Sequence, residues 1–136
     1  YFADQVGQPK AATLALNLKR IDPGVQVEAV QLKLNADNMA DTFSDADVVV
    51  EGFDGAVEKK MLMECFAGSA KLVVSACGVA GLDIDGIVTR KVDNVHIVGD
   101  FKTEAGDDNL YAPKVMLVAS VMSRIVLNHC LNGGPL

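Results

Sequence analysis

The chain has 136 residues, half of them hydrophobic, which suits one ordinary core, so a single domain over residues 1–136 is expected. Its 12 basic and 18 acidic residues give a net charge of -6 without a basic stripe, which argues against nucleic-acid and membrane-surface binding. The longest apolar stretch, 115–127, is shorter than the roughly 20 residues of a membrane span. Three cysteines without a Cys-x-x-Cys pair argue against zinc and favour a cytoplasmic location.

Hydrophobic periodicity and turn residues predict elements that alternate between helix and strand. In chain order we expect a helix at 9–21, a strand at 25–30, a short helix at 35–43 and a strand at 47–50. A helix at 56–66, a strand at 71–75, hairpin strands at 87–92 and 94–99, a surface loop at 101–109 and a helix at 113–131 follow. This order predicts an α/β fold: a Rossmann-like, mostly parallel sheet with helices on both faces, a small antiparallel hairpin and a long C-terminal helix.

Three helices carry apolar faces that predict how they pack. In 9–21, Leu14, Leu18 and Ile21 recur at helical spacing and are expected to form a buried stripe. The expected inner side of 56–66 consists of Val57, Met61, Leu62, Cys65 and Phe66. The helix at 113–131 is apolar around most of its circumference, so its own domain or a partner is expected to cover it.

Lys10 lies in the first turn of the first predicted helix. A cation there opposes the positive end of the helix dipole at a cost of roughly 0.3–1 kcal/mol. The arrangement becomes favourable when an anion occupies the helix N-terminus, because free amides and the ammonium then point at it. A lysine that reaches into water explains the position equally well, so both interpretations stay open.

Asp54 follows a buried strand and stands between Gly52 and Gly55, where a ligand can approach the backbone closely. A carboxylate at the end of a parallel strand suits a magnesium ion bound to substrate phosphates. The alternative is a helix N-cap, which position alone favours. Glu51, at the same strand end, is either a partner for a buried cation or a polar residue at the sheet rim.

Three further residues are of types that can act in catalysis or bind a metal. Cys77 ends a strand at the same edge of the sheet, but nothing near it in sequence would activate a nucleophile, so core packing is expected. His96 alternates with apolar neighbours in a strand and is expected to face solvent. His129 suits the last turn of its helix, and no metal-ligand spacing joins the two histidines.

Several segments together carry a family resemblance. They are VGQPK (6–10), RIDP (20–23), DVVVEGFD (47–54), SACGVAG (75–81), VGD (98–100) and APKV (112–115). In this order and spacing they resemble the ThiF/MoeB/HesA group, the bacterial relatives of ubiquitin-activating (E1) enzymes. The shorter thiamine-biosynthesis ThiF-like proteins are the most similar subgroup, and the resemblance covers essentially the whole chain.

The resemblance implies an adenylyltransferase that uses ATP and magnesium, and no zinc, to activate the C-terminal glycine of a small ubiquitin-like sulfur-carrier protein. It implies that Lys10 is the catalytic lysine on the ATP phosphates and that Asp54 binds the nucleotide and its magnesium. Relatives commonly form homodimers. The family's glycine-rich loop would lie upstream of Tyr1, so the chain is expected to be the C-terminal portion of the nucleotide-binding domain, inactive alone. Gly55 replaces the family's usual Asn.

Two alternatives from other classes stay open. One is a non-catalytic dimerising or carrier-docking α/β module, which the apolar closing helix suits. The other is half of a Rossmann dinucleotide-binding oxidoreductase, for which the second half of the chain offers no catalytic His or Lys–Tyr pair. A Gly-x-Gly-Gly segment upstream would favour adenylation, and Gly-x-Gly-x-x-Gly would favour a dinucleotide.

Overall fold

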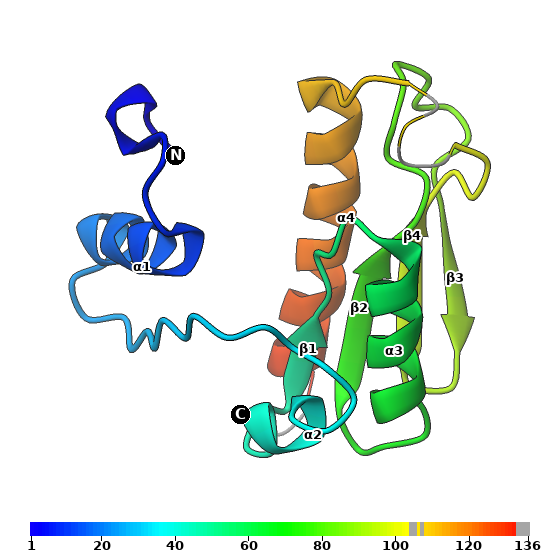
Figure 1. Ribbon diagram of the computed structural model, residues 1–136. Helices are drawn as coiled ribbons and strands as arrows, with labels where there is room; N and C mark the ends of the chain where they lie inside the picture. The colour runs from blue at the N-terminus through cyan, green and yellow to red at the C-terminus, as the bar shows by residue number, and fades with distance from the viewer. Residues whose placement is uncertain (104–105, 107, 133–136) are drawn as a thin grey trace. The chain divides into compact units, whose positions relative to one another are not determined.

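The computed structural model describes residues 1–103, 106 and 108–132, and the chain divides into two compact units, Tyr1–Leu34 and Asn35–Leu136. The first unit contains a 3-10 helix, η1 (Ala3–Gln5), and helix α1 (Lys10–Ile21). The second contains the sheet and the remaining helices (Figure 1).

In the first unit, α1 lies where the sequence predicted a helix, but its apolar stripe is not buried. The side chains of Gln5 and Asn17 exchange hydrogen bonds of 2.8 and 3.1 Å, which hold η1 to α1. Leu14 is 46% exposed and Ile21 is 81% exposed, and Thr13 is the buried residue of the helix. The expectation of a buried stripe is wrong within this unit, because 34 residues offer too little surface to cover one.

The strand expected at 25–30 does not form, and residues 25–35 have no regular secondary structure. Alternating apolar residues indicate a strand only where a neighbouring strand accepts its backbone hydrogen bonds. None of the strands in the described part of the chain pairs with this segment. The prediction was wrong because an alternating pattern describes the side chains of a segment and does not show whether a neighbouring strand is available to pair with it.

A four-stranded sheet forms the centre of the second unit, with strands in the order β1-β2-β4-β3. The strands are β1 (Val48–Val50), β2 (Leu72–Ala76), β3 (Val88–Val92) and β4 (Val95–Gly99). β1 pairs with β2 and β2 with β4 in parallel, whereas β3 and β4 form an antiparallel hairpin. The predicted mostly parallel sheet with a small hairpin is therefore confirmed.

The helices of this unit are α2 (Met39–Thr42), α3 (Ala56–Phe66) and α4 (Ala112–Leu131). α3 has the predicted bounds, and α4 begins one residue earlier than predicted. α2 is shorter than expected because the Asn35 side chain accepts hydrogen bonds from the amides of Asp37 and Asn38, which favours a turn over helix. The described residues of 101–109 contain no helix and no strand, as predicted.

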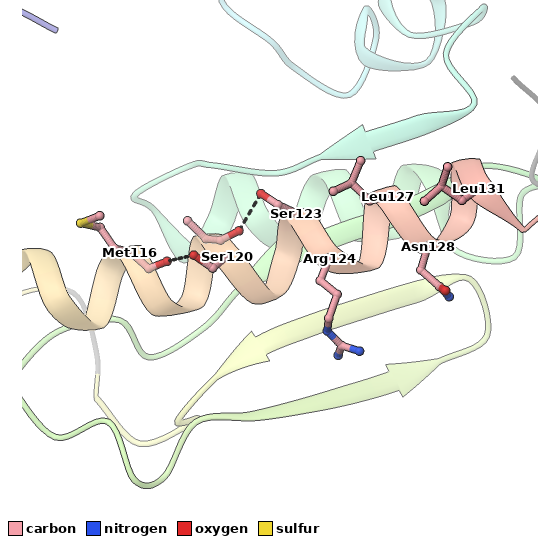
Figure 2. Close-up of a pocket in the computed structure, with 8 residues that line it drawn as sticks. Met116, Ser120, Ser123, Arg124, Leu127, Asn128 and Leu131 are labelled. Carbon is pink, nitrogen blue, oxygen red and sulfur yellow. Dashed lines mark hydrogen bonds between the residues drawn. The ribbon is translucent and has the colours of Figure 1, made fainter.

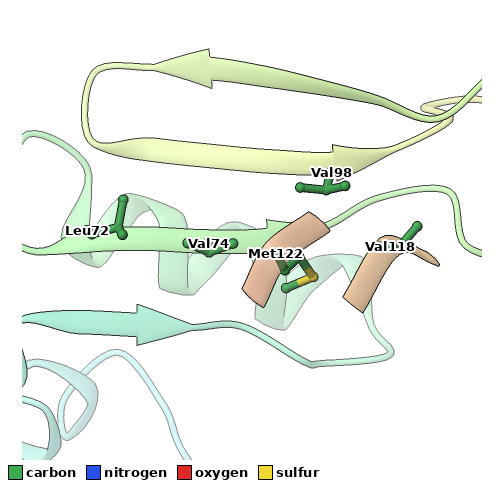
Figure 3. Close-up of a cluster of buried hydrophobic side chains, with 5 residues drawn as sticks. All are labelled: Leu72, Val74, Val98, Val118 and Met122. Carbon is green, nitrogen blue, oxygen red and sulfur yellow. The ribbon is translucent and has the colours of Figure 1, made fainter. Parts of the chain in front are cut away.

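The helices cover both faces of the sheet (Figure 1). Figure 3 shows Leu72, Val74 and Val98 from β2 and β4 packed against Val118 and Met122 of α4. Side chains alternate along a strand, so the fully buried Val73 faces the opposite side, where α3 packs against β2. There α3 buries Leu62 and Phe66, but Val57 is 77% exposed, so its predicted inner position is wrong.

α4 is long and apolar, and only one side of it is covered within this unit. Its 20 residues satisfy the length and composition of a membrane span, with 17% of the tested window buried, so the limit drawn from 115–127 was too short. A core helix of an α/β protein passes the same test, and α4 packs on β2 and β4 in that way. Of its residues, Lys114, Val118 and Met122 are buried.

Candidate functional site at the strand ends

A cavity lies at the carboxyl ends of the parallel strands β1 and β2, the edge at which open α/β sheets bind ligands. Its volume is about 410 Å³, and we call it the strand-end cavity. Its lining residues are Asp54, Gly55, Ala56, Lys59, Ala76, Cys77, Gly78, Val79 and Thr103. Asp54 comes from the loop after β1, and Cys77 follows β2 directly. The cavity therefore contains one of the two predicted site residues.

Asp54 is not a helix cap. The N-cap of α3 is Gly55, which has no side chain to cap the helix, so the N-cap alternative for Asp54 is wrong. The Asp54 side chain is exposed, and within the described part of the chain its carboxylate has no hydrogen-bond or ion-pair partner. A Cβ at Gly55 would overlap the Glu58 carboxylate, so that side chain lies where the family's asparagine would project.

Glu51 pairs with a lysine ammonium, which resolves the alternative left open by the sequence, although the cation, Lys59, is 24% exposed rather than buried. The Glu51 side chain is fully buried, and both carboxylate oxygens accept from Lys59 Nζ, at 2.9 and 3.1 Å. Ser75 Oγ and the Phe53 amide also donate to this carboxylate. Lys59 Nζ donates in addition to the carbonyl of Ala76 at 3.1 Å. One ammonium thus joins the ends of β1 and β2.

A second buried pair lies beside the cavity, between α4 and the loop after β4. Lys114 Nζ is 2.6 Å from Asp100 Oδ2, and the two side chains are 1% and 8% exposed. The amides of Lys102 and Thr103 donate to the same carboxylate at 2.8 and 3.0 Å. Burial alone raises the pKa of Asp100, but the hydrogen bonds from Lys114, Thr103 and Lys102 outweigh burial and hold that pKa well below its usual range.

The two lysines hold the ends of one segment, residues 76–80, which forms a wall of the strand-end cavity. Lys59 donates to the carbonyl of Ala76, and Lys114 donates to the carbonyl of Ala80 at 2.5 Å. Between them Gly78 has φ of 77°, and a Cβ there would overlap Asp100 Oδ1. The glycine is therefore required both by its backbone conformation and by the close approach of the carboxylate.

Cys77 is exposed and lines the cavity, so the expectation of core packing is wrong. β2 ends at Ala76 and the chain turns at Gly78, which leaves the thiol beyond the packed strand. His96 is partly buried on the face of β4 that packs against α4, so the expected solvent-facing position is also wrong. Burial, followed by the charges of Lys91 and His129, lowers the pKa of His96.

Lys10 is the first residue of α1 and is exposed. Its backbone carbonyl accepts from the Tyr1 hydroxyl at 3.2 Å, and its ammonium has no hydrogen-bond or ion-pair partner among the described residues. Its position at the start of a 12-residue helix agrees with the predicted placement. Lys10 and Asp54 belong to different units, and their action on one ligand stays a prediction.

A second hollow, of about 650 Å³, runs along the exposed side of α4 (Figure 2). The hydroxyl groups of Ser120 and Ser123 donate hydrogen bonds to backbone carbonyls of the same helix, those of Met116 and Ala119, at 2.8 and 2.9 Å. The remaining surface is largely apolar, with Leu127 at 60% exposure. Arg124 is the charged residue in its lining, beside the polar side chains of Ser120, Ser123 and Asn128.

Sequence reasoning missed the residues that build the site. Lys59 and Thr103 were not singled out, and Asp100 and Lys114 entered only as parts of the family segments 98–100 and 112–115. The available signal was a lysine within the first turn or so of a helix, four residues after Gly55 for Lys59 and three after Tyr111 for Lys114. Among the described residues, no group of three or more His, Cys, Asp or Glu side chains could hold a metal ion.

Comparison with solved structures places the fold. One match is the crystal structure of TcdA, the Escherichia coli tRNA N6-threonylcarbamoyladenosine dehydratase, in complex with ATP. It is similar to this chain with a TM-score of 0.68 and 17% identity, over 97% of this chain and 70% of that one. Two further TcdA structures match with TM-scores of 0.70 and 0.71 and identities of 15% and 16%, again over 97% of this chain and 69% and 70% of theirs. No curated protein sequence matches significantly.

The sheet order and the match over 97% of the chain define an α/β fold similar to that of TcdA. The family profile of ThiF matches residues 1–127, so the chain belongs to the ThiF family. Members of this family are ATP-using enzymes of the adenylyltransferase type that act on ubiquitin-like carrier proteins.

Proposed function

We propose that the chain is part of an ATP-dependent adenylyltransferase that activates the C-terminal glycine of a small sulfur-carrier protein of thiamine biosynthesis. The observation that supports it best is the Asp54 carboxylate, which is exposed at the strand-end cavity and has no partner among the described residues. Magnesium prefers one or two carboxylates together with phosphate oxygens and water. Asp54 fits that chemistry, and bound magnesium would supply positive charge at the phosphates.

In the proposed reaction, a carboxylate oxygen of the carrier's terminal glycine attacks the α-phosphorus of ATP. The bond from that phosphorus to the bridging oxygen breaks, and pyrophosphate leaves with the electron pair. Lys10 contributes a cation for the charge that develops on the phosphates, and the start of α1 adds free amides. The protein would act through position and electrostatics rather than through a covalent intermediate.

The carrier is preferred over a nucleic acid as substrate. TcdA acts on tRNA by its name, but this chain has a net charge of -6, which repels a polyanion. The homodimer and the cytoplasmic location stay predictions. Sedimentation velocity tests the first, with a dimer expected at micromolar concentration and a monomer at all concentrations counting against it.

The direct test is paramagnetic line broadening by Mn²⁺ with ATP, which detects weak binding by the 136-residue chain. Broadening is expected at the amides of 53–56 and 76–79, and Asp54→Asn should remove it. Lys10→Ala should weaken it. The exposed residues Asp37 and Lys19 provide matched controls, as Asp37→Asn and Lys19→Ala, which should leave it unchanged. Equal broadening in wild type and Asp54→Asn would overturn the proposal.

A further inference from the structure

Lys59 lines the strand-end cavity but has no hydrogen left for a ligand. Its ammonium has three N–H groups, and three acceptor oxygens surround it: both carboxylate oxygens of Glu51 and the carbonyl of Ala76, all within 3.1 Å. The side chain is 24% exposed, so the cavity reaches it. Its effect on a bound ligand therefore has to pass through the groups it holds.

Those groups bracket Asp54. The Glu51 carboxylate that Lys59 holds also accepts from the amide of Phe53, the residue before Asp54. On the other side, the Lys59 amide donates to the carbonyl of Gly55, the residue after Asp54, at 3.1 Å. One lysine thus ties both neighbours of Asp54, one through its side chain and one through its backbone.

A purely structural role does not explain the Lys59–Glu51 ion pair well. An ion pair whose carboxylate is fully buried and whose ammonium is 24% exposed returns little net stability, because both charges lose most of their hydration, and apolar residues of similar volume often serve as well. Here the buried carboxylate belongs to Glu51, which directly follows the last residue of β1 and lies three residues before Asp54. Four hydrogen bonds from three donor groups, Lys59 Nζ, Ser75 Oγ and the Phe53 amide, fix the course of the loop from 51 to 54.

We propose that Lys59, through Glu51, is the positioning residue that fixes the Asp54 carboxylate at the mouth of the strand-end cavity. This inference rests on the proposed role of Asp54 toward the metal and nucleotide. Without the Lys59 ammonium, the buried Glu51 carboxylate loses its counter-charge and the Phe53 amide loses a fixed acceptor. Asp54 then samples several positions, and the metal–nucleotide complex loses a preorganised ligand.

The test uses Lys59→Met and Lys59→Arg in the 136-residue chain, with Mn²⁺ and ATP at a fixed, sub-saturating concentration. Partners that orient a metal ligand typically change metal affinity by roughly 10–100-fold when removed, so Lys59→Met should reduce the broadening at the Gly55 amide about tenfold or more. Lys59→Arg keeps the charge and should restore most of it. Lys60→Met is the matched control, because within the described residues Lys60 pairs with the exposed Glu64 alone, at 3.5 Å.

Asp54→Asn, measured in the same series, separates the two proposals. If it leaves the broadening unchanged, the proposed function fails and this inference fails with it. If Asp54→Asn removes the broadening while folded Lys59→Met stays within twofold of wild type, only the positioning role is overturned. Should Lys59→Met fail to fold, Lys59→Gln, which keeps a donor for Glu51, takes its place under the same tenfold criterion. Faster hydrogen exchange at the Phe53 amide is expected in the variant that loses broadening, and unchanged exchange there would contradict the mechanism.

Discussion

Replacing Lys114 with methionine should destabilise the protein strongly, although the helix that carries it is otherwise apolar. The substitution removes the ammonium that lies 2.6 Å from Asp100 and leaves that carboxylate, 8% exposed, without its counter-charge. Breaking a buried pair from one side costs about 3–5 kcal/mol. The amides of Lys102 and Thr103 still donate to Asp100, so we expect about 3 kcal/mol, the lower end of that range.

Urea denaturation followed by circular dichroism measures this cost. With a slope of about 1–3 kcal/mol per molar urea, the midpoint should fall by about 1–3 M. Lys60→Met is the control, since that lysine is 74% exposed and its helical pair contributes at most about 0.5 kcal/mol. Adding Asp100→Asn to Lys114→Met should recover about 1 kcal/mol or more of the loss. A cost below about 1 kcal/mol for Lys114→Met would refute the reasoning.

Three further predictions follow from the same geometry. Gly78→Ala should lower the free energy of unfolding by more than about 2 kcal/mol in urea denaturation, because φ is 77° and the new Cβ would overlap Asp100. Gly52 has open space around it, so Gly52→Ala should change stability by less than about 0.5 kcal/mol, and similar costs for the two variants would contradict the overlap. Because the pKa of Asp100 is lower in the folded state than its unfolded value of about 4, the ionised carboxylate stabilises the fold above that value. Urea midpoints should therefore fall progressively as the pH drops below about 5, and less steeply in Lys114→Met than in wild type. Parallel curves for the two proteins would argue against this role of Asp100. Cys77 should react with Ellman's reagent several times faster than the two partly buried cysteines, and equal rates would place it in the core.

Local patterns predicted the elements whose partners lie within the sheet. The unbroken valine run at 48–50, the bounds of α3 and the hairpin around Asp93 all rest on side-chain periodicity and turn chemistry over a few residues. Asp54 was found in the same way, since a carboxylate after a buried strand lies at the ligand-binding edge whatever the rest of the chain does. These features need no knowledge of distant contacts.

The features that the sequence did not predict depend on distant partners. Lys114 contacts Ala80, which is 34 residues away, and Lys59 contacts Ala76, which is 17 residues away. A lysine on a helix is ordinarily taken as solvated, and nothing local marks these two as buried or half-buried. The same holds for 25–30, whose alternating pattern gives no sign that a partner strand is missing, and for Cys77, whose exposure follows from the turn after β2.

Anomalous diffraction from crystals of the chain grown with ATP and Mn²⁺ tests the central claim most directly. The account predicts a manganese peak within ligand distance, roughly 2.1–2.2 Å, of an Asp54 carboxylate oxygen, with nucleotide density in the strand-end cavity. Manganese bound at other carboxylates while ATP density lies elsewhere, for example along the exposed side of α4, would contradict it.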